Sequence, residues 1–193
     1  MTSRVILISP AMNPALRQAR FDDGTTSLDE SGAAAARAAA GDLRPPTRVF
    51  TSPSARCQET AVALDFDGVA VPDLGGLDAG RWRGLTLDEV AANEPEAVGS
   101  WLADPDGAPH GGESVRDVCE RVGRWLDIAR DADGRTLAVV EPDVVRAAVV
   151  HALGLPVSVF WRLDVAPLTA TELSGRAGRW NLRVGSALTA GEL

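Results

Sequence analysis

The chain has 193 residues, of which 45% are hydrophobic and 24% are charged, so it can bury a sizeable core. Its formal net charge is −8 at pH 7, and all 19 basic residues are arginines. An acidic surface repels polyanions, which excludes nucleic acid and anionic membranes as expected partners. No stretch approaches the roughly 20 apolar residues of a membrane span, and no signal sequence precedes the first apolar run, so we expect a cytoplasmic protein.

Residue types that bind metals are scarce in the chain. Cys57 and Cys119 follow no metal-ligand spacing, and His110 and His151 form no cluster with a carboxylate at a recognisable spacing. We therefore expect no metal and no cofactor, and the two cysteines suit a reducing compartment. The absence of lysine beside abundant alanine and arginine is typical of a GC-rich, actinobacterial genome, and it carries no information on function.

The first predicted elements are a short strand and an alanine-rich helix. The β-branched run Val5–Ile8 ends abruptly at Ser9, as a buried strand does when it delivers a loop to a site. Ser27 and Glu30 have the spacing of a capping box, which predicts that the helix begins there and ends at Gly41.

In the next segment a strand passes directly into a helix. The pattern predicts a second buried strand over Arg48–Ser52, with Ser52 as the N-cap and Pro53 as the first helical residue. Thr86 and Glu89 repeat the capping-box pattern and predict another helix start.

The C-terminal half continues the alternation of helices and strands. Apolar residues at helical spacing predict a helix over Ser114–Ala129, in which Cys119 and Trp125 are packing residues. A third buried strand is expected over Thr136–Pro142, and the helix after it should end at Gly154. The segments "ATELSG" and "RWNLRVG" predict a closing hairpin.

These patterns predict one α/β domain over residues 1–193. A mostly parallel central sheet should carry helices on both faces, which gives three layers. Sites in such folds lie beyond the carboxyl ends of the strands, which here are Ser9, Ser52 and Glu141.

Several motifs resemble those of the histidine phosphatase superfamily, the group that includes the phosphoglycerate mutase-like phosphatases. The segment "TSPSARCQETA" is similar to its Ser-x-x-x-Arg-x-x-x-Thr-Ala motif. The segments "GRWRGLTLDEV" and "PHGGESVRDVCERV" are similar to its Gly-x-Trp-x-Gly-Leu-Thr loop and its Pro-x-Gly-Gly-Glu-Ser segment. The resemblance spans nearly the whole chain, and it implies the phosphoglycerate mutase-like fold with Arg56 as the phosphate-binding arginine.

The catalytic motifs of that family are replaced in this sequence. The resemblance places the segment 9–11 where the family has Arg-His-Gly, whose histidine attacks phosphorus. It places the segment 141–143, which is Glu-Pro-Asp, where a second histidine opens a His-Gly-Gly segment. Gly76 stands where the family usually has a proton-donating glutamate. Of the family's five chemical positions, Arg56 is therefore the only one that this sequence keeps.

The replacements change the expected charge of the cleft. A dianionic phosphoryl group is stabilised by charge-assisted hydrogen bonds from cations, whereas here Arg56 faces Glu141. Unit charges about 4 Å apart interact by about 4 kcal/mol at an effective dielectric near 20, so this carboxylate should disfavour phosphate. Pro10 and Pro142 also remove backbone N–H groups that would otherwise contact oxygens. We therefore expect no phosphohistidine chemistry.

The main candidates each keep two interpretations. Arg56 either binds an anionic ligand or pairs with Glu141 and closes the pocket. Glu141 is either a general acid or base or the partner in that pair, and it is the one candidate catalytic residue. His110 is either a loop residue or a proton carrier at the pocket rim, and His151 is expected in the core or at an interface. Cys57 is either a packed thiol or one whose pKa is lowered by a helix N-terminus.

The remaining candidates surround the same cleft. Asp78 and Asp143 are alternative proton donors, and Glu113 either organises the loop and helix start or contacts the ligand. The residues expected to bind a ligand are Arg56, Ser9, Asn13, His110, Glu113 and Trp82.

Three functional hypotheses follow. The first is a pseudoenzyme that binds a small metabolite, anionic or not, or a protein partner in the inherited cleft. The second is a repurposed isomerase, dehydratase, cyclase or non-phosphoryl hydrolase, in which Glu141 acts as acid or base and Arg56 orients the substrate. The third is residual phosphatase activity through a displaced group. A fold hosts many functions, so the scaffold cannot decide among them.

Overall fold

A computed structural model describes residues 3–41, 46–176 and 178–188. Six strands form one sheet in the order β3-β2-β4-β1-β5-β6. The first four strands are mutually parallel, and β5 and β6 form an antiparallel hairpin beside β1. The strands are β1 (Ser3–Ile8), β2 (Arg48–Thr51), β3 (Val69–Ala70), β4 (Arg135–Val139), β5 (Thr169–Arg176) and β6 (Arg179–Ala187). The predicted mostly parallel α/β fold and its closing hairpin are confirmed.

Helices connect the parallel strands and extend one end of the molecule. The α-helices are α1 (Pro14–Arg17), α2 (Glu30–Ala39), α3 (Ala55–Ala63), α4 (Leu87–Asn93), α5 (Pro95–Ala103), α6 (Val115–Asp131) and α7 (Pro142–Leu153). The 3₁₀ helices are η1 (Pro72–Leu74), η2 (Gly80–Trp82) and η3 (Val157–Arg162). None of the helices in these described ranges is long and apolar enough to cross a membrane.

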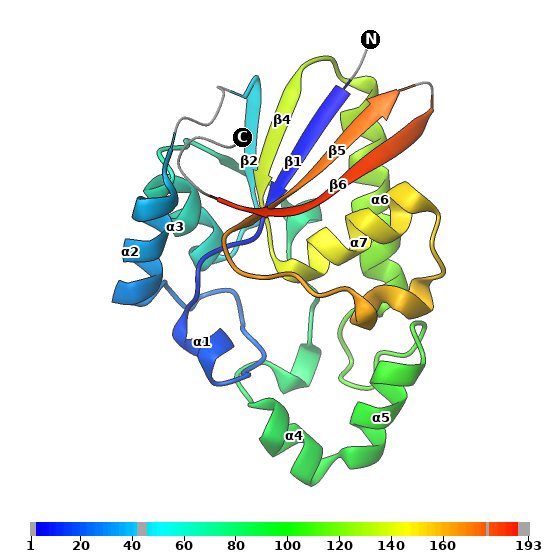
Figure 1. Ribbon diagram of the computed structural model, residues 1–193. Helices are drawn as coiled ribbons and strands as arrows, with labels where there is room; N and C mark the ends of the chain where they lie inside the picture. Colours follow the sequence, from blue (N-terminus) through cyan, green and yellow to red (C-terminus); the bar gives the residue numbers. More distant parts are fainter. Residues whose placement is uncertain (1–2, 42–45, 177, 189–193) are drawn as a thin grey trace.

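Both faces of the sheet are covered because the central strand β1 is apolar on both sides. Val5 and Leu7 belong to the cluster that contains α6 and α7, whereas Ile6 and Ile8 pack with residues of α2 and α3. This alternation follows from the two-residue period of a strand. Figure 1 shows the two pairs of helices on opposite sides of the sheet.

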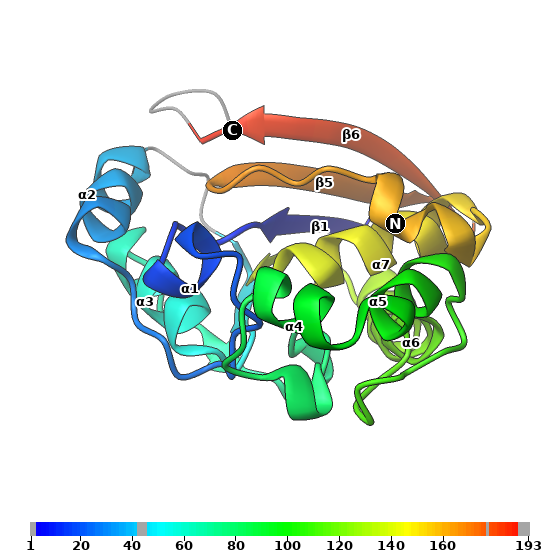
Figure 2. The same ribbon diagram turned by 90° about the horizontal axis from the view of Figure 1, so that it is seen from below.

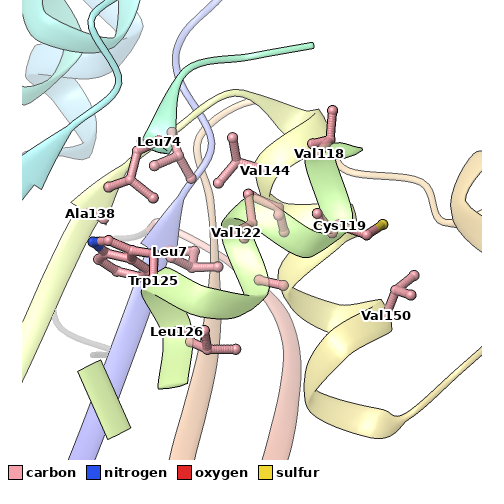
Figure 3. Close-up of a cluster of buried hydrophobic side chains, with 14 of the residues drawn as sticks. Leu7, Leu74, Val118, Cys119, Val122, Trp125, Leu126, Ala138, Val144 and Val150 are labelled. Carbon is pink, nitrogen blue, oxygen red and sulfur yellow. The ribbon is translucent and has the colours of Figure 1, made fainter. Parts of the chain in front are cut away.

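Helix α6 supplies the apolar side chains of the larger cluster. Figure 3 shows Val118, Val122, Trp125 and Leu126 from this helix against Leu7 of β1. The helix begins after a capping box, in which the Ser114 hydroxyl and the Asp117 carboxylate bond each other's backbone N–H groups. The expectation that Cys119 and Trp125 are packing residues is confirmed by their burial.

The short helices α1 and α4, together with α5, lie beyond the carboxyl ends of β1 and β4 (Figure 1). Figure 2 views the molecule from this end, with β1, β5 and β6 as neighbouring strands. The predicted capping box at Thr86 and Glu89 is present at the start of α4. These segments surround the open end of the sheet, where the loops after β1, β2 and β4 meet.

Two predicted helix starts are wrong. Helix α2 begins at Glu30 with Asp29 as its N-cap, because the Asp29 carboxylate accepts the Gly32 N–H at 2.6 Å; Ser27 is not the cap. Helix α3 begins at Ala55 with Ser54 as the N-cap residue, so neither Ser52 nor Pro53 opens it.

The strand before α7 is also shorter than predicted. It ends at Val139, and Pro142 is the first residue of α7, with Glu141 at the N-cap position. The helix ends before Gly154 as predicted, where φ is 60°. His151 is exposed and bonds Asp127 of α6 at 3.1 Å, so of its two expected places, the core or an interface, the core is wrong.

Gly32 of α2 generates a stability prediction. A Cβ at this position would lie 2.1 Å from the carbonyl oxygen of Met12, in the loop after β1. We expect Gly32→Ala to lower the free energy of unfolding by about 1–3 kcal/mol in urea denaturation, although alanine is the better helix former. Gly99→Ala in α5 is the matched control, since nothing lies within 4 Å of its Cβ position. This control should gain about 0.5–1 kcal/mol, and a similar gain at Gly32 would contradict the predicted clash.

Candidate functional site

A cleft of about 990 Å³ opens at the carboxyl ends of the parallel strands. It lies where an α/β sheet places its ligands, and its volume suits a small organic molecule. Its lining comes from the loops after β1, β2 and β4, the segments 20–25 and 75–79, helix α5, and the segment 161–167. Segments far apart in the chain therefore meet in one cavity.

The floor of the cleft is a buried ion pair between Arg56 of α3 and Glu141 at the start of α7. Arg56 Nε donates to Glu141 Oε2 at 3.0 Å and to Oε1 at 3.1 Å, and Nη2 also bonds Oε2. Ser54 Oγ donates to Glu141 Oε1 at 2.7 Å. The two charged side chains are only 7% and 11% exposed, so the pair is held largely out of water. Both carboxylate oxygens are therefore occupied by donors from one helix start.

Gly76 gives the Glu141 side chain its space. A Cβ on Gly76 would lie 3.0 Å from Glu141 Cγ and 3.3 Å from its Cβ, which is closer than ordinary van der Waals contact. Arg121 holds this segment in place by donating to the carbonyls of Asp73 and Gly75 at 2.7 and 2.9 Å. A side chain at position 76 would therefore require the Glu141 side chain to shift by a few tenths of an ångström.

Asp143 and Arg146 extend the floor along α7. Arg146 Nη1 donates to Asp143 Oδ1 at 2.9 Å, and its Nε donates to the Leu163 carbonyl at 2.8 Å. Burial raises the pKa of Asp143, the nearby Arg146 opposes this effect, and the negative charge of Glu141 adds to it. In contrast, the N–H of Gly80 donates to Asp78 and lowers its pKa. Of the two alternative proton donors, Asp143 is the one that keeps a proton more readily.

Aromatic side chains form the opposite wall. Trp101 and Trp161 have ring centroids 4.5 Å apart, and Phe21 lies 5.7 Å from Trp101. All three line the cleft. Arg146 connects this wall to Asp143, because its guanidinium carbon lies 5.8 Å from the centre of the Trp161 ring.

Two sequence-predicted ligand residues hold neighbouring segments and do not line the cleft. The buried Ser9 hydroxyl bonds the carbonyl of Ala166 and accepts the N–H of Thr169 at 3.1 Å. The buried Asn13 caps α1 and donates to Asp22 Oδ2 at 2.7 Å. Asn13 therefore positions a cleft carboxylate and does not face the cavity itself.

Trp82 and His110 lie behind the aromatic wall. Trp82 is fully buried and donates to Glu94 Oε1 at 3.3 Å, so the expectation that it lines the cleft is wrong. His110 packs against it with ring centroids 4.9 Å apart, and is itself 1% exposed. His110 Nδ1 accepts the Gly112 N–H at 3.1 Å, whereas Nε2 has no hydrogen-bond partner among the described residues. The geometry favours its interpretation as a loop residue over a proton carrier at the rim.

Two further candidates have structural partners. Glu113 pairs with Arg121 at 2.7 Å beside a smaller hollow of about 490 Å³, which matches its interpretation as an organiser of the loop. Burial raises the pKa of the Cys57 thiol well above its usual value, and the Glu141 carboxylate adds to this effect. Cys57 is therefore a packed thiol.

Of the sequence-predicted candidates, the structure brings Arg56, Glu141 and the two alternative proton donors, Asp78 and Asp143, into the cleft. Sequence reasoning missed Trp101, Trp161 and Asp164, because none of them belongs to a motif recognised in the sequence. Ser54 was accessible to prediction, since it precedes a helix in the arginine motif. Within the described ranges, no group of three or more His, Cys, Asp or Glu side chains could hold a metal ion.

Known proteins resemble this chain in both sequence and structure. The sequence profile of the histidine phosphatase superfamily (branch 1) matches residues 16–186, so the chain belongs to this superfamily. A bifunctional protein of Mycobacterium tuberculosis is 35% identical over 182 residues, which is 88% of this chain and 50% of that protein. The chain therefore spans about half the length of that relative. A glucosyl-3-phosphoglycerate phosphatase of Mycolicibacterium vanbaalenii is 36% identical over 147 residues, which covers 68% of this chain and 65% of the relative.

The solved structures agree with this assignment. A mycobacterial glucosyl-3-phosphoglycerate phosphatase aligns with a TM-score of 0.84 and 28% identity, covering 97% of this chain and 100% of that chain. A protein described as mycobacterial hydrolase 1 aligns with a TM-score of 0.85 and 27% identity, covering 97% of this chain and 99% of that chain. The predicted phosphoglycerate mutase-like fold is confirmed.

The ion pair at the floor generates a test by double-mutant cycle. Arg56→Met leaves a largely buried carboxylate without its cation, and we expect it to cost about 3 kcal/mol of unfolding free energy. The double variant with Glu141→Gln should lose less than the sum of the single losses. The exposed pair of Arg116 and Asp106 is the control, and its coupling should stay below about 1 kcal/mol. Equal couplings for both pairs would contradict the buried arrangement.

His110 generates a pH prediction. Burial lowers its pKa from the usual 6.5, so the folded chain takes up a proton less readily than the unfolded chain. Its stabilising contribution is therefore complete above pH 6.5 and is lost as the pH falls through the folded-state pKa. We expect the stability advantage of the wild type over His110→Gln to shrink between about pH 7 and pH 5, measured by urea denaturation. Parallel pH profiles for the two proteins would contradict this.

Proposed function

We propose that this member of the superfamily binds a small molecule in the cleft and does not carry out phosphohistidine-based phosphatase or mutase chemistry. The observation that carries the proposal is the bonding of Arg56 to Glu141. The guanidinium that would grip an anionic ligand already holds a carboxylate of the same chain, through Nε and Nη2. A phosphate would have to displace that carboxylate or bind beside a negative charge, and both are unfavourable.

The distribution of imidazole groups supports the same proposal. The chain has two histidines, and neither lines the cleft. His110 is buried behind Trp82, and His151 is exposed on α7 beside Asp127. Ser9, which follows β1, uses its hydroxyl to hold the segment 166–169, and within the described part of the chain it bonds no basic side chain that could activate it.

The related phosphatases provide the contrast. The mycobacterial glucosyl-3-phosphoglycerate phosphatase has been solved with inorganic phosphate and with VO3. We infer that the present chain keeps the cleft of such a protein, and that Glu141 takes the place on Arg56 that an anionic ligand would need.

A repurposed enzyme is the second candidate, and one observation favours it. Asp143 lines the cleft, and burial raises its pKa, which suits a carboxyl group that holds or transfers a proton. Glu141 is less suited to that role because both of its oxygens already accept hydrogen bonds. In this alternative Arg56 keeps Glu141 in place, and Asp143 acts as acid or base on a substrate without a phosphoryl group.

The wild type should not hydrolyse p-nitrophenyl phosphate, and it should bind orthophosphate only weakly in calorimetric titrations. Glu141→Gln removes the competing charge while it keeps the size of the side chain. We expect this variant to bind orthophosphate at least about tenfold more tightly, still without turnover, because no nucleophilic imidazole is present.

Asp164→Asn is the matched control. It removes one negative charge from the same cleft, but Asp164 makes no contact with Arg56. The control should change phosphate affinity far less than Glu141→Gln does. Turnover by the wild type that disappears in Arg56→Ala would refute the proposed function.

A further inference from the structure

The charges that line the cleft are unequal. Six carboxylates and four arginines contribute to the lining, so two negative charges are in excess. The fourth arginine, Arg20, donates to the Gly84 carbonyl and to Gln18. The other three are paired with cleft carboxylates as Arg56 with Glu141, Arg83 with Asp78 and Arg146 with Asp143. Every arginine of the cleft makes an ion pair or hydrogen bonds, whereas Asp22, Asp23 and Asp164 form no ion pair with an arginine among the described residues.

Asp164 is the clearest of the uncompensated carboxylates. It is exposed, lines the cleft, and makes no hydrogen bond or ion pair with any other described residue. Leu163 is the residue before Asp164, and its carbonyl accepts a hydrogen bond from Arg146 Nε at 2.8 Å. Arg146 Nη1 also donates to Asp143 Oδ1 at 2.9 Å. Asp143 and Asp164 therefore belong to the same part of the cleft.

An indole surface lies next to these carboxylates. Trp161 is three residues before Asp164 and contacts Trp101, and both rings line the cavity. Leu16 is 39% exposed at the same cleft, so part of the lining is apolar surface open to a ligand. Apolar rings beside unpaired negative charge suit a ligand with the opposite charge and an apolar body.

We propose that the cleft takes a small organic cation, in which an amine contacts Asp164 and Asp143 and an apolar or aromatic body packs against Trp161. This inference rests on the proposed function, because a cleft that held phosphate would need an excess of positive charge. Asp143 feels the negative charge of Glu141 as well as the positive charge of Arg146, so a ligand cation would add to Arg146 in stabilising the Asp143 carboxylate.

The test uses probes that share one ring and differ in charge: phenethylamine, 2-phenylethanol, phenylacetate and phenyl phosphate. Their affinities for the whole chain are measured by NMR chemical-shift titration at constant, low ionic strength. We expect phenethylamine to bind at least about tenfold more tightly than phenylacetate or phenyl phosphate, and more tightly than the neutral alcohol.

Asp164→Asn should weaken phenethylamine binding about threefold to fivefold, the factor expected of a solvent-exposed ion pair. We expect this substitution to leave the fold intact, because Asp164 has no hydrogen-bond or ion-pair partner to lose among the described residues. Asp133→Asn is the control: it removes the same charge from an exposed turn outside the cleft and should change the affinity less than about twofold.

The outcomes separate this inference from the proposed function. Equal binding of phenethylamine and 2-phenylethanol, or no binding of either, overturns the cation site and leaves the proposed function standing. Preferential binding of phenylacetate overturns the cation site alone. Preferential binding of phenyl phosphate overturns both. Equal losses in Asp164→Asn and Asp133→Asn would also overturn the site, because the effect would then come from net charge.

Discussion

The buried bond between Arg56 and Glu141 is the interaction on which the cleft depends. It joins the start of α3, after β2, to the start of α7, after β4, so it fixes the relative position of two neighbouring strand ends. Desolvation offsets most of the attraction in a buried ion pair, so its main effect is positional and its net contribution to stability is small. Gly76 favours the arrangement, because a Cβ at this position would lie 3.0 Å from Glu141 Cγ and would push the Glu141 side chain aside.

The same bond decides what the open end of the sheet offers to a ligand. Helix N-termini carry partial positive charge and unpaired N–H groups, and two of them, those of α3 and α7, meet at Glu141. A site of this kind ordinarily suits an anion from solution. Here the anion is part of the chain, held by Arg56 and Ser54, so the cleft presents carboxylates and aromatic rings to solvent instead.

Membership in the superfamily therefore establishes the scaffold, while the chemistry is decided by a few side chains. The aromatic cluster of Trp82, Trp101 and His110 illustrates this division between scaffold and chemistry. His110, Trp82 and Trp101 pack edge to face, so they hold the segment with α4 and α5 against the cleft whatever the ligand is. Asp143 and Asp164, by contrast, contribute little to packing and face the cavity.

The sequence alone determined the fold class, since strand and helix periodicities and capping patterns are local, and the arginine motif located Arg56 at the floor of the site. It also located Glu141, because the carboxyl ends of parallel strands converge. It did not determine which neighbouring polar residue caps a helix, as Asp29 in place of Ser27 shows. Only the tertiary structure decided that Trp82 and His110 lie behind the cleft and that Trp161 and Asp164 line it. These residues come from three segments far apart in the chain, around positions 82, 110 and 161–164, and their contacts depend on how those segments pack, which no local pattern records.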